Sequence, residues 1–187
     1  MTEPADNRAI YRVTINAPIE TVWNTLVKTD EVLPFFFGAV CDTEDGLKPG
    51  AAMRMVTPNR RHAAVVGEVL EFAPPHRYAH TLKFTQWDDA PCTVTYELKE
   101  VAGGVEFTLT TEGAPAGSCT EKSMARGGGY IANTLKQMAE TGKPSLGTRM
   151  MLAVMGLAAP LTPKACRIDN WPLATLKDKL NAKTGEG

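Results

Sequence analysis

The sequence has too few cysteines and histidines, too widely scattered, for a common metal or redox site. Its 187 residues include four cysteines and three histidines. The cysteines stand at positions 41, 92, 119 and 166, so no two form a Cys-x-x-Cys pair of the kind that binds zinc or cycles as a dithiol. Scattered cysteines are typical of a reducing compartment, so we expect a cytoplasmic protein without a metal or other cofactor.

Neither sign of charge dominates the chain, and no apolar run is long. Twenty lysines and arginines against 21 aspartates and glutamates give a net charge of −1. Nucleic-acid binding needs an excess of positive charge on one face, so we expect no nucleic-acid partner. The longest apolar run, at 146–161, is shorter than the roughly 20 residues that cross a bilayer, so we expect no membrane span.

The patterns that are present predict a single α+β domain. A chain of this length corresponds to about one domain. Apolar and polar residues alternate over 10–17, which predicts a strand, and apolar residues three and four apart after Pro18 predict a short helix. Residues 30–37 suggest a second short helix. Strand-like runs then extend from residue 38 to 111 with no helix between them, which predicts an antiparallel sheet of six to seven strands.

One long helix is predicted after the sheet. Ser118 and Glu121 form a capping-box signature, and apolar residues up to Met138 recur at helical spacing, so we expect about 20 helical residues ending near Gly142. Glycines 127–129 lie inside this helix, where each costs about 1 kcal/mol relative to alanine. We therefore expect the helix to bend there or to lie very close to another backbone.

Residues 144–187 are predicted to form a helical extension with a disordered tail from residue 181. The run at 146–161 is apolar almost all round a helix, so some other surface must bury it. Three alternatives stay open: it packs on its own domain and closes one end of a cavity, it forms a homodimer contact, or it rests on a membrane surface. A last helix would carry a thin apolar stripe of Leu173, Leu176 and Leu180.

Three stretches of the sequence carry a resemblance to a known family. They are NAPIETVW at 16–23, GEVLEF with PPHRY at 67–78, and the helical stretch 129–143 with its GYI, LKQM and ETGK segments. In this order they resemble the helix-grip domains of the SRPBCC superfamily, which includes START domains and birch-pollen-allergen-like proteins. Within it, the chain is most similar to homologues of the activator of the heat-shock protein 90 ATPase.

The resemblance covers about residues 8–143 and implies a particular architecture. A curved antiparallel sheet would grip the long helix, with two short helices after the first strand and a cavity between sheet and helix. Where the family often has tryptophan, near the end of the second short helix and in the long helix, this chain has phenylalanine at 35–37 and Tyr130. The resemblance implies little about chemistry, because the superfamily contains carriers, sensors, co-chaperones and a few enzymes.

His80 is the polar residue of most interest in the predicted sheet. His76 and His80 are four residues apart, which in a strand is about 13 Å and too far for one metal ion. Strand alternation puts Tyr78, His80, Leu82 and Phe84 on one face, which we expect to point inward. His80 is then a core histidine bonded to a neighbouring group, a polar anchor for a ligand, or a catalytic acid or base.

We expect the cavity to bind an apolar or amphipathic small molecule, as in a carrier or sensor, with His80 and Tyr78 orienting it. The predicted ligand-binding residues are Trp23, Phe36, Met53, Met55, Tyr78, His80, Leu82, Tyr96, Phe107, Ile131, Leu135 and Met138. One alternative is a co-chaperone-like module that binds a chaperone. Another is an enzyme with His80 or Tyr78 as acid or base. No sequence feature requires catalysis, so the sequence favours a non-enzymatic role.

Overall fold

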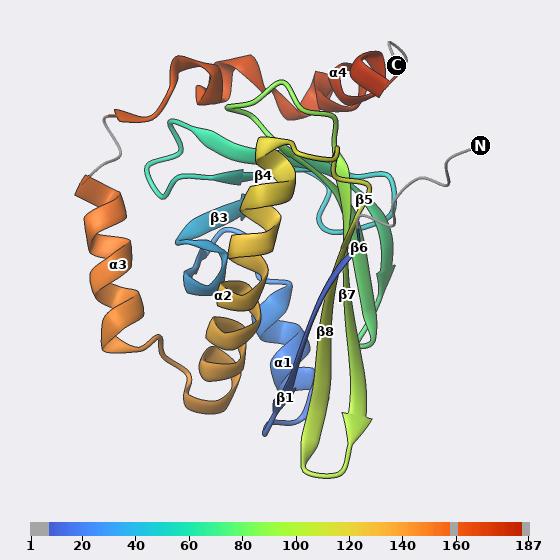
Figure 1. The fold of residues 1–187 in the computed structure, drawn as a ribbon, viewed down its shortest axis with the longest axis vertical. Helices are drawn as coiled ribbons and strands as arrows, with labels where there is room; N and C mark the ends of the chain where they lie inside the picture. Colours follow the sequence, from blue (N-terminus) through green and yellow to red (C-terminus); the bar gives the residue numbers. More distant parts are fainter. Residues whose placement is uncertain (1–7, 158–160, 185–187) are drawn as a thin grey trace.

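In the computed structural model, which describes residues 8–157 and 161–184, an antiparallel sheet wraps around one long helix (Figure 1). The strands are β1 (Ala9–Ile15), β2 (Val32–Leu33), β3 (Ala39–Asp42), β4 (Ala52–Val56), β5 (Ala63–Ala73), β6 (Arg77–Phe84), β7 (Cys92–Val101) and β8 (Gly104–Glu112). The helices are α1 (Ile19–Leu26), α2 (Cys119–Thr141), α3 (Leu146–Leu157) and α4 (Leu173–Thr184), with 3-10 turns η1 (Pro34–Phe36), η3 (Lys164–Cys166) and η4 (Ile168–Asn170). The strand order is β1-β8-β7-β6-β5-β4-β3-β2.

The predicted α+β helix-grip fold is confirmed, with differences in the region that follows α1. The sheet has eight strands rather than six to seven, because β2 adds a short edge strand beside β3. Residues 30–37 form β2 and the turn η1 instead of a second short helix. Pro34 explains the difference, since a residue before proline disfavours helical angles, and Leu33 is extended with φ −102° and ψ 96°.

The long helix begins and ends where the sequence predicts. The Ser118 hydroxyl accepts a hydrogen bond from the backbone N–H of Glu121 at 3.0 Å, and the Glu121 carboxylate accepts one from the N–H of Gly117 at 2.6 Å. At the other end Gly142 has φ +72°, a left-handed conformation that glycine adopts without steric cost. Glycines 127 and 128 face the rings of Phe37 and Tyr11 rather than a neighbouring backbone.

The main core lies between the inner face of the sheet and helices α1 and α2. It contains apolar side chains from every strand of the sheet, from α1 and from α2, with Ile15, Met53, Phe107 and Leu135 completely buried. Burying such side chains contributes roughly 1.5–3 kcal/mol each. This core holds α2 in the grip of the sheet and fixes the walls of the site described below.

A second, smaller core joins the C-terminal extension to the opposite face of the sheet. The predicted leucine stripe of α4 packs on Val40, Val56, Ala63 and Val66. Strand alternation on β4 makes both cores possible, since Met53 and Met55 point into the main core while Val56 packs with the leucines of α4. Helix α4 continues to Thr184, beyond the point where we expected disorder to begin, and residues 185–187 lie outside the described residues.

Helix α3 lies at the side of the molecule, away from both cores (Figure 1). Its Leu152 side chain lies against Gly38, just after η1. Within residues 8–157 and 161–184, no helix is both long enough and apolar enough to cross a membrane. In the same part of the chain, no three metal-ligating side chains come together.

Candidate functional site

A cavity of about 50 Å³ lies between η1, the inner face of β6 and β7, and one side of α2. Its walls are Phe36, Phe37, Leu82, Phe84, Val94, Tyr96, Ser123, Met124, Gly127 and Ile131. Apart from Ser123 and the hydroxyl of Tyr96, these side chains offer only apolar surface. The cavity is therefore suited to an apolar group rather than to an ion or a sugar.

The size of the cavity limits what it can hold without a change of shape. A dry apolar cavity of about 150 Å³ is known to take up benzene. At about 50 Å³, this cavity is too small for an aromatic ring in the conformation described here. A larger ligand requires part of the wall to move.

Beside the cavity, three polar rings on β6 and β7 lie against one another, two of them stacked and the third tilted. Tyr78 and Tyr96 are directly paired across the two strands, with ring centroids 5.5 Å apart. The ring of His80 lies 5.1 Å from that of Tyr78 and 5.7 Å from that of Tyr96. All three side chains are buried, so the inward orientation expected from strand alternation is what the structure has.

Two hydrogen bonds define the protonation state of His80. Its Nδ1 lies 2.8 Å from the carbonyl oxygen of Thr81, which can only accept, so Nδ1 carries the proton. Burial lowers the pKa of His80 to about 4, partly opposed by the bond to Thr81, and the ring is therefore neutral near pH 7. Nε2 is then an acceptor, and the Tyr96 hydroxyl, 3.4 Å away, is positioned to donate to it.

The Tyr78 hydroxyl is buried and has no hydrogen-bond partner among the described residues. Burial raises the pKa of Tyr78 well above its ordinary value, and it raises the pKa of Tyr96 too. Both phenols therefore keep their protons at neutral pH. The Tyr78 hydroxyl is thus a donor without a partner among the described residues, although Tyr78 does not line the cavity.

The structure brings only some of the predicted site residues to the cavity. Of the predicted set, Phe36, Leu82, Tyr96 and Ile131 line it. Tyr78 and His80 lie beside Tyr96. The others pack elsewhere: Trp23, Met53, Met55, Phe107 and Leu135 are buried in the main core, and Met138 is half-buried on α2.

Sequence reasoning missed several wall residues, namely Phe37, Phe84, Val94, Ser123, Met124 and Gly127. A usable signal exists for two of them, because Ser123 and Gly127 lie at four-residue spacing before the predicted Ile131 and in the same row on α2. Serine and glycine do not register as apolar positions, so a search for hydrophobic residues passes over them. Their small size is what leaves space at this side of the helix.

A curved sheet that grips a long helix and encloses an apolar cavity beside it defines a helix-grip protein. The family model described as "Activator of Hsp90 ATPase homolog 1-like protein" matches residues 16–140. The chain belongs to this family. The matched region ends within α2, so α3 and α4 lie outside it. No curated protein matches the chain.

Solved structures similar to this chain share its fold at low sequence identity. Protein CV1439 from Chromobacterium violaceum is 21% identical, with a TM-score of 0.56, over 72% of this chain and 97% of that one. An HSP90 activator from Plasmodium falciparum is 20% identical, with a TM-score of 0.52, over 67% and 91%. The Aha1 dimer from Colwellia psychrerythraea is 13% identical, with a TM-score of 0.57, over 73% and 98%.

Proposed function

We propose that this protein binds an apolar or amphipathic small molecule between η1, the β6–β7 strands and α2, without catalysing a reaction. The observation that carries this proposal is the apolar cavity at that position. Removing apolar ligand surface from water contributes roughly 25 cal/mol per Å² before the costs of association. On this proposal the site must open to admit its ligand, because a cavity of about 50 Å³ is too small for one.

Phe37 is the part of the wall that we expect to move. Its side chain is 38% exposed, and its backbone has φ +54°, a region that a bulky residue rarely adopts. The ring stacks on Tyr130 with centroids 4.5 Å apart and also lines the cavity. Rotation of this ring toward solvent would enlarge the cavity without disturbing the buried core.

The polar end of an amphipathic ligand would meet the group formed by Tyr78, His80 and Tyr96. Tyr96 lines the cavity and links it to the other two rings. A ligand carbonyl could accept from the Tyr78 hydroxyl, and a ligand hydroxyl could donate to the Tyr96 oxygen. His80, neutral and bonded to Thr81, would hold Tyr96 in position rather than exchange protons with the ligand.

Two glycines of α2 provide a matched test. Gly127 lines the cavity, whereas a Cβ on Gly129 would have nothing within 4 Å. We expect Gly127→Leu to fill the cavity and weaken binding of the apolar fluorophore N-phenyl-1-naphthylamine at least tenfold, about 1.4 kcal/mol. Gly129→Leu, which changes the same helix in the same way, should bind like the original protein.

Fluorescence titration measures the affinity, and native mass spectrometry of the freshly purified protein shows whether a bound molecule copurifies. Equal fluorophore affinity in the two leucine variants would contradict the assignment of the cavity as the binding site. Absence of both fluorophore binding and a copurified molecule would contradict ligand binding itself.

A second candidate function is co-chaperone-like binding to the 90-kDa heat-shock protein. It is supported by the family description and by the HSP90 activator among the similar structures. The test is an ATPase assay of that chaperone with and without this protein. Stimulation of the ATPase rate together with a complex on a sizing column would support this function. The absence of both effects would contradict it.

A further inference from the structure

Helix α3 presents an apolar face to solvent. Leu146, Met150, Val154 and Leu157 are 79, 69, 60 and 82% exposed. At 100° per residue these four lie within about a quarter of the helix circumference. The opposite side, with Thr148 and Leu152, turns toward the body of the protein. We call the four exposed residues, with Arg149 and Lys143, the α3 face.

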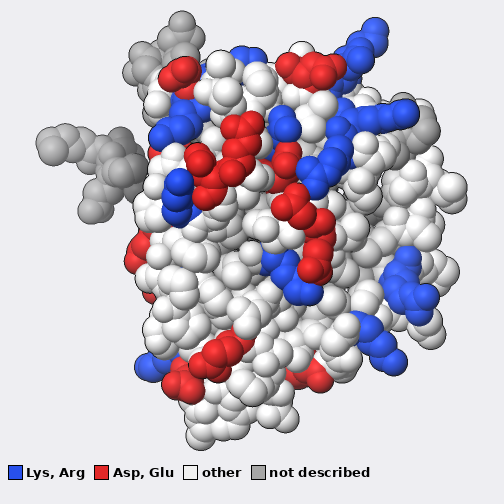
Figure 2. Space-filling view, turned by 180° about the vertical axis from the view of Figure 1, so that it is seen from behind, with Lys and Arg blue, Asp and Glu red and all other residues white. Residues whose placement is uncertain are grey.

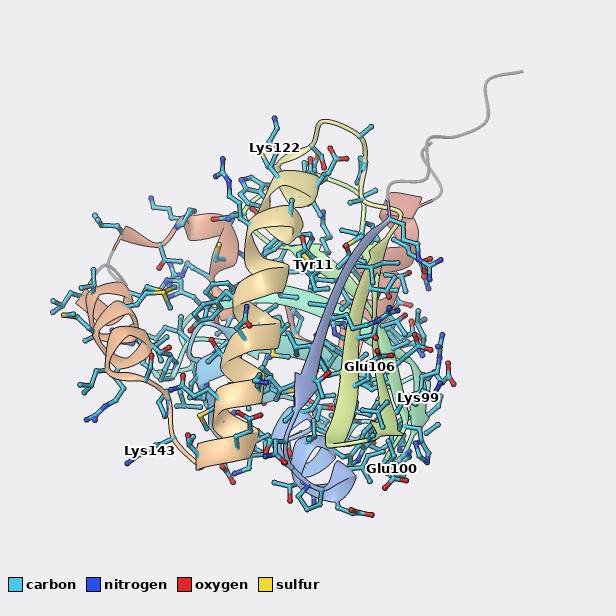
Figure 3. The ribbon with its side chains drawn as sticks, turned by 60° about the horizontal axis from the view of Figure 1, so that its bottom comes forward. Tyr11, Lys99, Glu100, Glu106, Lys122 and Lys143 are labelled. Carbon is cyan, nitrogen blue, oxygen red and sulfur yellow. The ribbon has the colours of Figure 1, made fainter. Side chains whose placement is uncertain are left out.

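The charged residues at this face are all positive. Arg149 lies on α3 beside the apolar side chains, and Lys143 projects from the junction of α2 and α3 (Figure 3). Neither forms an ion pair within the part of the chain that the structure describes. Figure 2, in which α3 lies along the right-hand edge, shows blue but no red on that edge. Exposed apolar side chains flanked by cations alone are complementary to an anionic lipid surface.

We propose that the α3 face docks on anionic membranes, with its leucine, methionine and valine side chains at the boundary between headgroups and acyl chains. The usual interfacial helix has its own polar face toward water. In this protein the side of α3 opposite the α3 face packs on the body of the protein instead, with Leu152 against Gly38. The proposal concerns the extension beyond the family domain and does not depend on ligand binding in the cavity.

A second copy of the chain is a poorer match for the same face. Four side chains of this kind bury roughly 400 Å² per copy, or about 800 Å² for a symmetric pair, by the same area scale as for core burial. Stable interfaces bury about 1,200–2,000 Å² in total. A pair of copies joined through this face would also carry the Arg149 and Lys143 cations of both chains at its edge, and the α3 face as defined here has no acidic residue to offset them.

The test is flotation of the full chain with lipid vesicles. We expect binding to vesicles of phosphatidylcholine with about 30% phosphatidylglycerol and much weaker binding to phosphatidylcholine alone, with the difference lost at about 1 M salt. Val154→Glu should lower the partition coefficient at least tenfold. Leu70→Glu, at a residue that is 46% exposed on β5 at a distance from α3, should leave it unchanged.

A second pair of variants tests the charges separately. Lys143→Gln and Arg149→Gln should each weaken binding to anionic vesicles about fivefold, as expected for one cation near such a surface. Circular dichroism verifies that all variants are folded, which we expect because every substituted residue is exposed. Flotation that is absent, or that is the same for Val154→Glu and Leu70→Glu, overturns the proposal. So does a dimer in sedimentation velocity that Val154→Glu dissociates while vesicles bind neither protein.

Discussion

A Cβ atom on Gly128 would lie 2.1 Å from Cε2 of Tyr11, so the tyrosine ring occupies the space that a side chain of α2 would otherwise fill. The Tyr11 hydroxyl donates to the carbonyl oxygen of Ala125 at 2.9 Å. Tyr11 belongs to β1, an edge strand of the sheet. This contact therefore fastens that edge to the long helix, and it explains why α2 tolerates a glycine at this position.

Gly128→Ala should lower the free energy of unfolding by up to about 2 kcal/mol. Overpacking costs about 1–3 kcal/mol, and the gain in helix propensity of about 1 kcal/mol offsets part of it. Gly129→Ala is the control, because nothing lies within 4 Å of its Cβ, and it should raise stability by up to about 1 kcal/mol. Urea unfolding of the two variants measures both values. Changes of the same sign would show that Tyr11 moves aside at no cost.

The two buried tyrosines beside His80 should respond differently to loss of their hydroxyls. Tyr78→Phe removes a hydroxyl that has no partner among the described residues, so stability should stay the same or rise by about 1 kcal/mol. Tyr96→Phe leaves Nε2 of the buried His80 without a donor and should cost about 1–3 kcal/mol. Thermal unfolding of the pair measures the difference. Equal effects would mean that Tyr96 and His80 are not hydrogen-bonded.

Stability should fall as the pH drops from about 6.5 toward 4, in part because of His80. The unfolded chain takes up a proton on this residue near its ordinary pKa of 6.5, whereas the folded protein does so only near its lowered pKa of about 4. The unfolded state therefore binds more protons in this window, which costs roughly 3 kcal/mol across it. Above pH 6.5 the contribution is fully retained.

His80→Gln should flatten the pH dependence of urea unfolding between pH 6.5 and 4 relative to the original protein. Nitrogen NMR of labelled histidine gives a direct check, since the signals that disappear in the variant belong to His80. Those signals should keep the pattern of a neutral ring with its proton on Nδ1 down to about pH 4. Protonation near pH 6.5 would contradict the buried, neutral assignment.

Arg54 connects the sheet to the C-terminal extension. Its guanidinium donates to the Asp42 carboxylate at 2.6 Å and to the carbonyl oxygen of Trp171, just before α4, at 2.8 Å. Both side chains of the ion pair are largely buried, but Asp42 keeps a second partner in Arg60 at 3.0 Å, so Arg54→Ala should cost about 2 kcal/mol. Arg8→Ala breaks the exposed pair with Glu112 and should cost less than about 1 kcal/mol.

Limited trypsin digestion shows whether α4 detaches. We expect cleavage in the extension to be faster in Arg54→Ala than in Arg8→Ala, because the lost bond to Trp171 loosens the start of α4. Identical digestion patterns would mean that the leucine stripe of α4 holds the extension by itself.

Local patterns determine much of this molecule. Helix α2 begins after Ser118 and ends at Gly142 because residues nearby in sequence satisfy the free backbone N–H and C=O groups at its two ends. Alternation places Tyr78, His80 and Leu82 inward because successive side chains of a strand point to opposite faces. Such features depend on residues close in sequence and could be predicted without the structure.

The alternating pattern predicts the wrong burial where a loop covers the outer face of a strand or where the strand is irregular. Lys83 should face solvent, yet it is buried, and its ammonium group donates to the carbonyl oxygens of Trp87 and Asp89. A register shift between Val69 and Glu71 interrupts β5, and Glu71 then pairs with Arg77 at 2.7 Å. A bulge of this kind changes the side to which later residues point, and nothing in the local pattern marks it.

The sequence by itself determined the helix-grip fold, because that fold can be predicted from the spacing of apolar residues and from a family resemblance spread over much of the chain. Only the tertiary structure decided which residues enclose the cavity, how small it is, and which side of α3 remains exposed. These properties depend on side chains from η1, β6, β7 and α2, which are distant in sequence. How these side chains pack against one another depends on the complete fold, so no single stretch of sequence predicts it.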